Sequence, residues 1–531
     1  MSQQSRLRQS RNRWKCKAGR RAEDERYLRK QVTRGKEERN RLKKELKDAN
    51  ARLRRLETQS RGLVVQHKVA LVFLALQLFL EARIGFRAVS RVLGVLAQAL
   101  GIKKAPCPQT VINWVTRLSL VRIRLATMLK GQAMELAPFS NGLIWMIDMS
   151  IALGTGKILT VLALNAHHHQ LTANAPGFQD VHCVASSVAD SWTGESIAAL
   201  LKRLIAVMGR PAAYLKDGGS DLRKAIHLLN EQGLGSPCID DISHVIANLL
   251  KYRYCDHPMF ETFLSACGRV SGKLKQTILA CLAPPKVHTK ARFMSVHRLI
   301  TWADRFLKLS PPGGAAKGST LWKLRTCLDR LPSCRAFIMR FRADALPLLE
   351  CQKILKTRGL SNGTLAQCES LIQAIPSADV QRDFSAYLQG QLDTATELGL
   401  EEIGLPISSD QIESLFGLAK QHGAGEIRDA DRIAIRLPAL CSTPTRAEAE
   451  QVLGIGVADQ YELTSCFTSL MKQRREVLPN RGRLESLGAN QARVHVELIP
   501  SAKNRSKNQD IVELSGCYQE SCDPVPRRQS G

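Results

Sequence analysis

Runs of apolar residues separated by turn residues divide the middle of the chain into strands and helices in a regular order. The runs GLIWMIDMSIALG (142–154) and GKILTVLALNA (156–166) are nearly continuous and meet at glycines, which is typical of buried strands in a hairpin. A third strand is expected at DVHCVASSVA (180–189), followed by an amphipathic helix over 191–209. Strands and helices then alternate up to residue 254. We therefore predict an α/β fold with a mixed-sheet core in the order β-β-β-α-β-α-β-α.

Helical periodicity predicts further regions on both sides of this core. A helical block with several basic stretches follows it, and the helix in SSDQIESLFGLAK (408–420) comes after that block. The polar, Pro-containing end of the chain is typical of disorder. The predicted domains are a basic arm and coiled coil at 1–62, a helical, helix-turn-helix-like DNA-binding domain at 63–137, the core at 138–254 and 401–425, a helical insertion at 255–400, a C-terminal helical region at 426–500, and a disordered tail at 501–531.

The net charge of the chain indicates the kind of partner that it binds. The chain of 531 residues has 77 Lys and Arg against 48 Asp and Glu, a formal net charge of +29. About half of the excess lies in residues 1–62. A basic balance of this size favours a polyanionic partner such as DNA, RNA or an acidic membrane surface, although a protein that is merely basic or associated with ribosomes has the same composition.

The basic arm also carries a heptad pattern. Apolar residues recur in alternating steps of four and three, with Leu28 and Val32 in weaker register upstream; they are Leu42, Leu46, Ala49, Leu53 and Leu56. This seam predicts a short coiled coil and hence a homodimer or higher homo-oligomer. A single solvated helix fits the same residues, because the seam covers about two good heptads.

The cysteines and the apolar runs bear on location. The 15 cysteines include no CxxC pair and no zinc-type spacing, and the first residues have no apolar core of a signal peptide. We expect reduced thiols in a cytoplasmic, bacterial protein that is associated with the nucleoid when bound to DNA. The longest apolar run, at 69–80, is shorter than the roughly 20 residues that a membrane span needs.

The helix expected in QTVINWVTRLSLVRIR is the candidate for reading DNA. Its inward positions are apolar, and it carries polar and basic residues that we place on exposed faces, namely Asn113, Arg117, Arg122 and Arg124. A helix of this kind can lie in a major groove. An ordinary helical bundle is the alternative.

Three acidic residues stand out by position. Asp148 lies near the end of an apolar strand, Asp217 ends the fourth strand before two glycines, and Glu413 lies in the first turn of a helix. Each also has an ordinary structural explanation. Asp148 could be a buried acid that accepts hydrogen bonds from the backbone, Asp217 a turn residue, and Glu413 a residue that interacts with the helix dipole. Together, carboxylates at neighbouring strand ends raise one another's pKa unless cations neutralise them, and oxygen ligands suit magnesium.

The motifs MIDMS, LKDGGSDL and SDQIESLFGLAK, in this order, resemble the motifs that carry the three acidic residues of DDE transposases, which belong to the ribonuclease H-like, retroviral-integrase superfamily. The resemblance covers about residues 140–255 and 400–425, and the block at 255–400 takes the place of an insertion domain. CIDDISHVIANLL (238–250) is similar to the Cys…His-then-helix element that precedes the insertion in some members.

The resemblance implies roles for particular residues. Asp148, Asp217 and Glu413 become ligands of two Mg²⁺ ions, for which Mn²⁺ substitutes. His244 becomes a neighbour of the reacting phosphate or a helper of the third carboxylate. Other acids compete for two of these roles; they are Asp240 and Asp241 for the third ligand and Asp221 for the second.

The implied activity is DNA transposition. The protein is expected to cleave a phosphodiester at the end of a mobile element and to join the freed 3′-hydroxyl to target DNA, with double-stranded DNA as its partner. Two alternatives stay open. One is a DNA-binding regulator or inactive transposase remnant without chemistry, and the other is a structure-selective nuclease with the same core.

Overall fold

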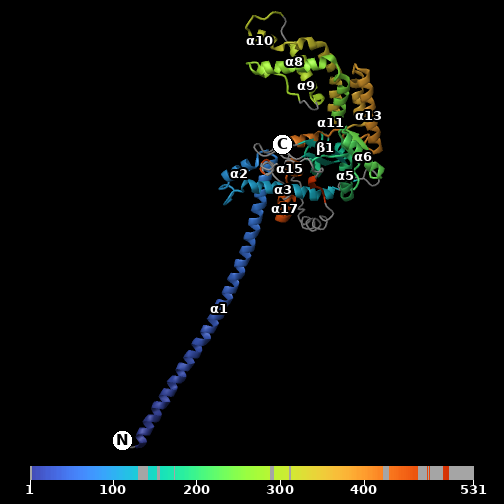
Figure 1. Ribbon diagram of the computed structural model, residues 1–531. Helices are drawn as coiled ribbons and strands as arrows, with labels where there is room; N and C mark the ends of the chain where they lie inside the picture. The colour runs from blue at the N-terminus through green and yellow to red at the C-terminus, as the bar shows by residue number, and fades with distance from the viewer. Residues whose placement is uncertain are drawn as a thin grey trace, which may run out of the picture. The chain divides into compact units, whose positions relative to one another are not determined.

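Six strands in the described part of the chain form one mixed sheet (Figure 1). The chain divides into two units, Met1–Val72 and Phe73–Gly531, and the sheet belongs to the second. This computed structural model describes residues 3–129, 141–151, 156–172, 174–287, 292–309, 313–421, 430–464, 475, 478 and 494–500. The tail at 501–531, for which disorder is predicted, lies outside the described residues.

The strand order is β5-β4-β1-β2-β3-β6. The strands are β1 (Leu143–Ile151), β2 (Lys157–Asn165), β3 (Val181–Ala189), β4 (Ala213–Lys216), β5 (Cys238–Asp240) and β6 (Val494–Leu498). β1, β2 and β3 form an antiparallel meander, β4 and β5 continue parallel to β1, and β6 pairs antiparallel with β3. The predicted mixed α/β architecture is confirmed.

β6 is a correction. It lies within 426–500, where the sequence predicts helices. A strand of five residues carries little local signal, and its partner β3 is about 300 residues away in the chain. Ser187 on β3 donates its hydroxyl to the Val496 carbonyl at 2.7 Å, so the pairing depends on contacts that periodicity does not reveal.

Helices cover both faces of the sheet. α5 (Gly194–Met208) and α6 (Ser220–Glu231) pack on one face through a cluster that includes Trp145 and Ile147 of β1. α15 (Ala430–Leu440), labelled in Figure 1, lies against the other face, and α14 (Asp410–Gln421) contacts β1 there. A sheet covered on both faces needs apolar residues at successive positions, which explains the continuous apolar runs of its central strands.

The described residues form further helices. They are α1 (Gln3–Leu80), α2 (Phe86–Val95), α3 (Pro108–Leu125), α4 (His168–Leu171), α7 (Ile242–Tyr254), α8 (Pro258–Lys275), α9 (Val296–Leu309), α10 (Thr320–Leu328), α11 (Arg335–Arg358), α12 (Asn362–Gln373), α13 (Ala378–Glu397), α16 (Arg446–Gly454) and α17 (Val457–Thr464). Among the described residues, none of these helices has the length and apolar character to cross a membrane.

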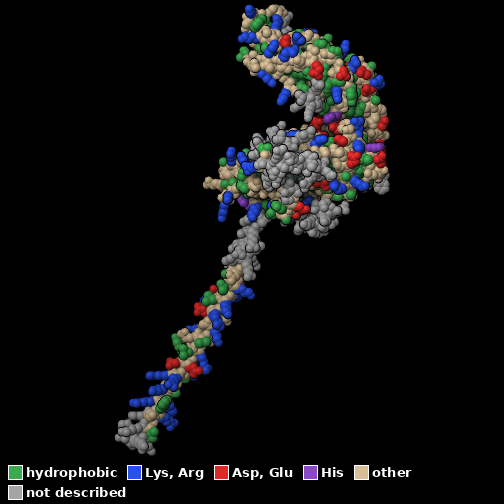
Figure 2. Space-filling model, in the orientation of Figure 1, with side chains coloured by type: hydrophobic (Ala, Val, Ile, Leu, Met, Phe, Trp, Pro, Cys, Tyr) green, Lys and Arg blue, Asp and Glu red, His purple; other side chains and the backbone are tan. Residues whose placement is uncertain are grey.

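α1 exposes an apolar stripe. Every described side chain between residues 7 and 51 is exposed, and Lys and Arg are prominent among them (Figure 2). Leu28, Val32, Leu42 and Leu46 are between 54% and 63% exposed. A second helix is needed to bury this stripe, so the predicted self-association stays a prediction. The boundary expected at residue 62 falls inside α1, which continues as one helix.

A buried carboxylate links the helices of 255–400 to the core. Asp344 of α11 is fully buried and accepts hydrogen bonds from the Tyr254 hydroxyl at the end of α7 and from Ser377 before α13. Ser377 donates both its backbone N–H, at 3.0 Å, and its hydroxyl, at 2.6 Å. Burial, and then the Asp344 carboxylate, raise the pKa of Tyr254 above its ordinary value. The packing of α7, α11 and α13 against one another therefore depends on Asp344.

Replacing Asp344 by Ala is expected to lower the free energy of unfolding by about 3 kcal/mol, because the buried donors of Tyr254 and Ser377 lose their acceptor. Urea unfolding followed by circular dichroism measures the loss. Asp383→Ala on α13 is the matched control, since its side chain is 51% exposed, and it should change stability by less than about 0.5 kcal/mol. Equal effects of the two substitutions would contradict the linking role of Asp344.

Candidate active site

The parallel pairing of β1 and β4 places two acids side by side. Ile147 lies opposite Lys216 at the end of the parallel ladder, so Asp148 and Asp217 are the next residues on adjacent strands. Adjacent strands are about 4.8 Å apart, and residues in register share a face of the sheet. The Asp148 Oδ1 atom accepts from the Met149 N–H at 2.6 Å, and the Asp217 Oδ1 atom accepts from the Gly219 N–H at 3.0 Å.

Gly219 lets the chain turn tightly after Asp217. A Cβ atom at this position would lie 2.9 Å from the Asp217 Oδ1 atom, closer than a side chain normally approaches. The glycine therefore allows the backbone to fold back beneath the carboxylate. The sequence signal of an acid before two glycines has this physical basis.

Two helices bring the third acid and a histidine to the same edge. Glu413 lies in the first turn of α14 and His244 in the first turn of α7. The His244 Nε2 atom and the Glu413 Oε1 atom are 3.1 Å apart. The two residues are 169 positions apart in the chain, so this contact requires the helical block at 255–400 to return the chain to the sheet.

Asp241 holds these two helices together. Its Oδ1 atom caps α7 by accepting from the His244 N–H at 3.0 Å. Its Oδ2 atom accepts from the Ser409 N–H at 2.6 Å and from the Ser409 hydroxyl at 2.9 Å. Asp241 is 1% exposed, and both its oxygens are engaged. The geometry therefore gives Asp241 a structural role and favours Glu413 as the third acid.

The other competing acids also lie apart. Asp240 forms an ion pair with the buried Lys216, at 2.6 Å between Nζ and Oδ1. Because neighbouring strand residues point to opposite faces, this pair lies on the face opposite Asp148 and Asp217. Asp221 lies in the first turn of α6 and acts on Lys224, whose pKa is raised first by Glu195 and also by Asp221.

The surroundings of Asp148 disfavour the ionised form of its carboxyl group. Burial raises the pKa of Asp148 to about 7, with further contributions from the charges of Asp217 and Glu413. The Met149 N–H and the charge of His244 act in the opposite direction. In turn, the hydrogen bond with Glu413 raises the pKa of His244 to about 9, although burial opposes it. The positive charge of His244 therefore offsets part of the negative charge of the three acids.

Lys420 belongs to the same edge and is not among the site residues predicted from the sequence. Its Nζ atom donates to the Ser150 hydroxyl at 2.6 Å, near the end of β1. Burial lowers its pKa, while the charge of Asp148 raises it. Lys420 follows Glu413 by seven positions, which places both on one face of α14. This seven-residue spacing is the sequence feature that indicates that Lys420 lies near Glu413.

The donor set suits a hard cation. Carboxylate oxygens are the ligands that magnesium prefers, and the net negative charge of the cluster is relieved by a divalent ion. Glu413 is 44% exposed, so solvent reaches the cluster. Among the described residues, no three His, Cys, Asp or Glu side chains are placed to hold a metal ion together as they stand. The match between this cluster and a magnesium ion therefore rests on the chemistry and charge of the ligands, and not on side chains that are already arranged around an ion.

The arginines of α3 have internal partners, which corrects an expectation. Arg122 is 8% exposed, and its Nε atom lies 2.7 Å from Glu448 of α16. Its Nη1 atom also donates to the Ala439 carbonyl at 2.8 Å and to the Cys441 carbonyl. The expected exposure of Arg122 on a DNA-reading face is wrong, because α15 and α16 pack against α3.

The neighbouring polar residues of α3 are half-buried. Arg124 pairs with Asp459 at 3.0 Å, and the Arg117 Nε atom donates to the Gln460 side chain at 2.8 Å. Both partners lie on α17, more than 300 residues away in the chain, so no local sequence pattern indicates them. Asn113 accepts from the Gln109 side chain at 3.0 Å. A role in DNA binding for these three residues stays a prediction.

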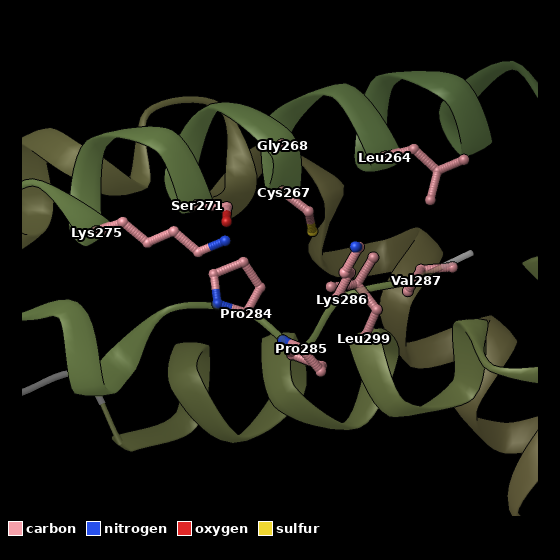
Figure 3. Close-up of a pocket in the computed structure, with 10 residues that line it drawn as sticks. All are labelled: Leu264, Cys267, Gly268, Ser271, Lys275, Pro284, Pro285, Lys286, Val287 and Leu299. Carbon is pink, nitrogen blue, oxygen red and sulfur yellow. The ribbon is translucent and has the colours of Figure 1, made fainter. Parts of the chain in front are cut away.

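A separate cavity lies among the helices of 255–400. It has a volume of about 370 Å³ between α8 and the loop that precedes α9. Lys275 and Lys286 reach it from opposite walls, near Ser271 and Cys267 (Figure 3). No acid is among the residues that line it. The cavity is thus basic and separate from the carboxylate cluster.

The structure brings together Asp148, Asp217, Glu413 and His244, the four residues for which the sequence predicts catalysis. No protein-family model matches the chain, and no curated protein matches it. Its function is therefore inferred from the arrangement of its own side chains.

Asp148→Asn is expected to stabilise the metal-free protein at pH 8. The raised pKa of Asp148 means that the folded state binds more protons than the unfolded state between about pH 4 and 7. Stability associated with this group is present below pH 4 and is lost as pH rises through 7. The variant should gain on the order of 2–4 kcal/mol at pH 8 and nothing near pH 4.

Thermal unfolding in EDTA at several pH values measures this difference. Asp383→Asn, on the exposed surface of α13, controls for the general loss of one negative charge. A stability difference between Asp148→Asn and the native chain that does not change with pH would contradict the raised pKa.

Arg122→Ala is expected to destabilise the protein by about 3–5 kcal/mol, because it leaves the half-buried Glu448 and several carbonyls without a donor. Glu448→Ala should cost less, since Arg122 keeps its carbonyl partners. Urea unfolding of both single variants and the double variant measures the coupling. Additive losses would show that the two side chains do not interact.

Proposed function

We propose that this protein is a DNA transposase that cleaves and joins phosphodiesters with divalent metal ions. One observation carries the proposal: Asp148 of β1, Asp217 after β4 and Glu413 of α14 meet at one edge of the sheet. Bringing three acids from distant segments together costs stability, because their negative charges repel one another and burial disfavours the ionised form of Asp148. A structural role does not repay that cost, whereas metal-dependent chemistry on a phosphodiester requires it.

The order of elements supports a ribonuclease H-like core. Three antiparallel strands precede two parallel strands reached through α5 and α6, in the order that the resemblance to DDE transposases implies. The third acid follows a helical block that fills the place of an insertion. Asp148 and Asp217 also lie at the carboxyl end of the parallel ladder between β1 and β4, and open α/β sheets place their ligands at that edge.

The side chains have distinct tasks in this proposal. Asp148, Asp217 and Glu413 hold the magnesium ions, which when bound stabilise the attacking and leaving oxygens of the phosphodiester. His244 is protonated at neutral pH and holds the Glu413 carboxylate in place through its hydrogen bond. Lys420 places a second positive charge beside Asp148. The ionised form of Asp148 is the one that binds a metal ion, so the apparent affinity for magnesium should increase as pH rises toward about 7.

The remainder of the chain fits DNA as the partner. The net charge of +29 favours a polyanion, and the basic α1 exposes the apolar stripe through which two copies would associate. Pairing two copies would bring two element ends together. The protein would act in the cytoplasm on the DNA of its host.

Magnesium-dependent cleavage and joining of labelled DNA tests the proposal. The substrate is the DNA that flanks the gene, where an element would carry its terminal repeats. Asp148→Asn, Asp217→Asn and Glu413→Gln should each reduce product at least about 100-fold, because each removes a metal ligand. DNA binding, measured by fluorescence anisotropy, should persist in all three variants.

Asp221→Asn is the matched control, since this acid lies four residues from Asp217 but outside the cluster. Its activity should equal that of the native chain. Cleavage without joined product would identify a nuclease instead. DNA binding with no metal-dependent product in the native chain would favour a regulator or an inactive remnant.

A further inference from the structure

The apolar stripe of α1 follows a single seven-residue repeat. Six of the seven large apolar side chains that are exposed on its described part fall at positions a and d of one heptad abcdefg, in which Leu42 is d and Leu46 is a; the six are Leu7, Trp14, Leu28, Val32, Leu42 and Leu46. Their exposed fractions lie between 54% and 66%. A seam of this kind on an exposed helix is buried when a second helix repeats the same spacing.

Charged residues flank the seam in two columns that differ in sign. Position e is basic in five of the seven repeats between residues 7 and 51, at Arg8, Lys15, Arg29, Lys36 and Lys43. The acids that flank the seam lie at position g, namely Asp24, Glu38 and Glu45, where Lys17 is the one basic residue. Figure 2 shows acidic, basic and hydrophobic side chains interspersed along this helix. The two columns therefore give the seam a charge pattern that a partner helix has to match.

This pattern distinguishes the two orientations of a helix pair. In a parallel pair, position g of one helix faces position e of the next repeat on the other helix, whereas in an antiparallel pair e faces e and g faces g. Parallel pairing of two α1 helices sets Asp24 against Arg29 of the second copy, and Glu38 against Lys43. Antiparallel pairing sets the basic e column against itself, and like charges at this spacing repel. The charges therefore favour the parallel orientation.

Lys17 also selects the alignment of the two helices along the seam. In a parallel pair without a shift, this lysine at position g faces Ala22 of the second copy, and no like charges meet between g and e. A shift by one repeat sets Lys17 against Arg29 or Lys15, depending on its direction. An unshifted pair also has closed two-fold symmetry, so no part of the seam stays unpaired.

The ion pairs within α1 leave these positions open to a second helix. Arg29 pairs with Glu25 at 2.6 Å, but Arg29 is 77% exposed. Glu38 lies 3.7 Å from Arg41 and is 66% exposed. Lys43 has no acid three or four residues away on its own helix. Exposed pairs of this kind contribute little by themselves, so the side chains lose little by also reaching across the seam.

Some seam positions are charged, which limits the strength of the pairing. They are Arg11, Arg21, Glu25 and Arg39. Polar residues at such positions lower the stability of a coiled coil and help to fix its register and number of strands. We therefore expect a dimer that dissociates measurably on dilution.

We propose that α1 pairs with α1 of a second copy as a parallel, unshifted, two-stranded coiled coil over residues 7–51. Val32 at position a with Leu28 and Leu42 at position d is the arrangement that favours two strands. Duplex DNA is the other candidate occupant of this surface, but its phosphates would contact the basic groups and leave the six apolar side chains exposed.

The orientation has a consequence for the whole chain. In a parallel pair both chains leave α1 at the same end, so the two copies of Val72 lie near each other. In an antiparallel pair over the same residues they would lie more than about 100 Å apart, at about 1.5 Å of rise per residue. The use of this arrangement to hold two DNA ends rests on the function proposed above, whereas the pairing rests on α1 alone.

A charge-exchange variant of the full chain tests the orientation. It carries Asp24→Arg, Arg29→Asp, Glu38→Lys and Lys43→Glu, so the facing charges of a parallel pair are reversed and the net charge is unchanged. Two-tag co-purification after mixing with the native chain measures which copies associate, and sedimentation measures the affinity. In the parallel arrangement the variant should pair with itself about as well as the native chain does. It should not pair with the native chain, because like charges would then meet at all four facing positions.

A second variant tests the contribution of position g. Asp24→Arg/Glu38→Lys should weaken self-association about 10- to 100-fold, because attraction becomes repulsion at each facing position. Glu37→Lys/Asp48→Arg makes the same change of net charge at positions f and c, away from the seam, and should change the dissociation constant less than about 3-fold. Circular dichroism checks that every variant keeps its helix.

Two results would overturn the proposal. One is a native chain that sediments as a monomer at tens of micromolar, and the other is a native chain that pairs with the charge-exchange variant in preference to itself, as antiparallel helices would. Neither result bears on the proposed chemistry, which is measured separately as magnesium-dependent cleavage. Loss of that cleavage with a parallel dimer intact would contradict the proposed function and leave the pairing standing.

Discussion

The buried carboxylate of Asp241 is the contact on which the rest of the site depends. It caps α7 with one oxygen and holds Ser409, just before α14, with the other. These bonds place the first turns of two helices beside each other, and each first turn carries one member of the site. Without them, Glu413 and His244 have no reason to face the ends of β1 and β4. The geometry of the cluster is thus set by an acid outside it.

The site concentrates negative charge within a strongly basic chain. Asp148, Asp217 and Glu413 repel one another at the sheet edge, and His244 and Lys420 offset part of that repulsion. Lys and Arg are concentrated in other parts of the chain, on α1 and along the helices of 255–400. Such a division suits a polyanionic substrate, which basic surfaces attract and a small acidic centre processes.

Much of the core was predictable because its signals are local. Strands covered on both faces require continuous apolar runs, and an acid at the end of a strand before glycines marks a turn that presents a carboxylate. Asp148 and Asp217 follow from these rules. Glu413 needed the resemblance as well, because nothing in a first-turn glutamate identifies its partner 169 residues upstream.

Other features depend on contacts that periodicity does not contain. Arg122 occupies a position that looks exposed on α3 alone, and it is buried by helices that come more than 300 residues later. β6 is too short to be distinguished from its helical surroundings by pattern, and pairing with β3 defines it.

Diffraction from crystals soaked in Mn²⁺ at pH 8 tests the central claim most directly. Manganese scatters anomalously and replaces magnesium at oxygen sites. The account predicts anomalous peaks in contact with the carboxylates of residues 148, 217 and 413, and their loss when residue 148 is changed to Asn. Peaks elsewhere in the molecule, with residue 413 directed away from the other two, would contradict it.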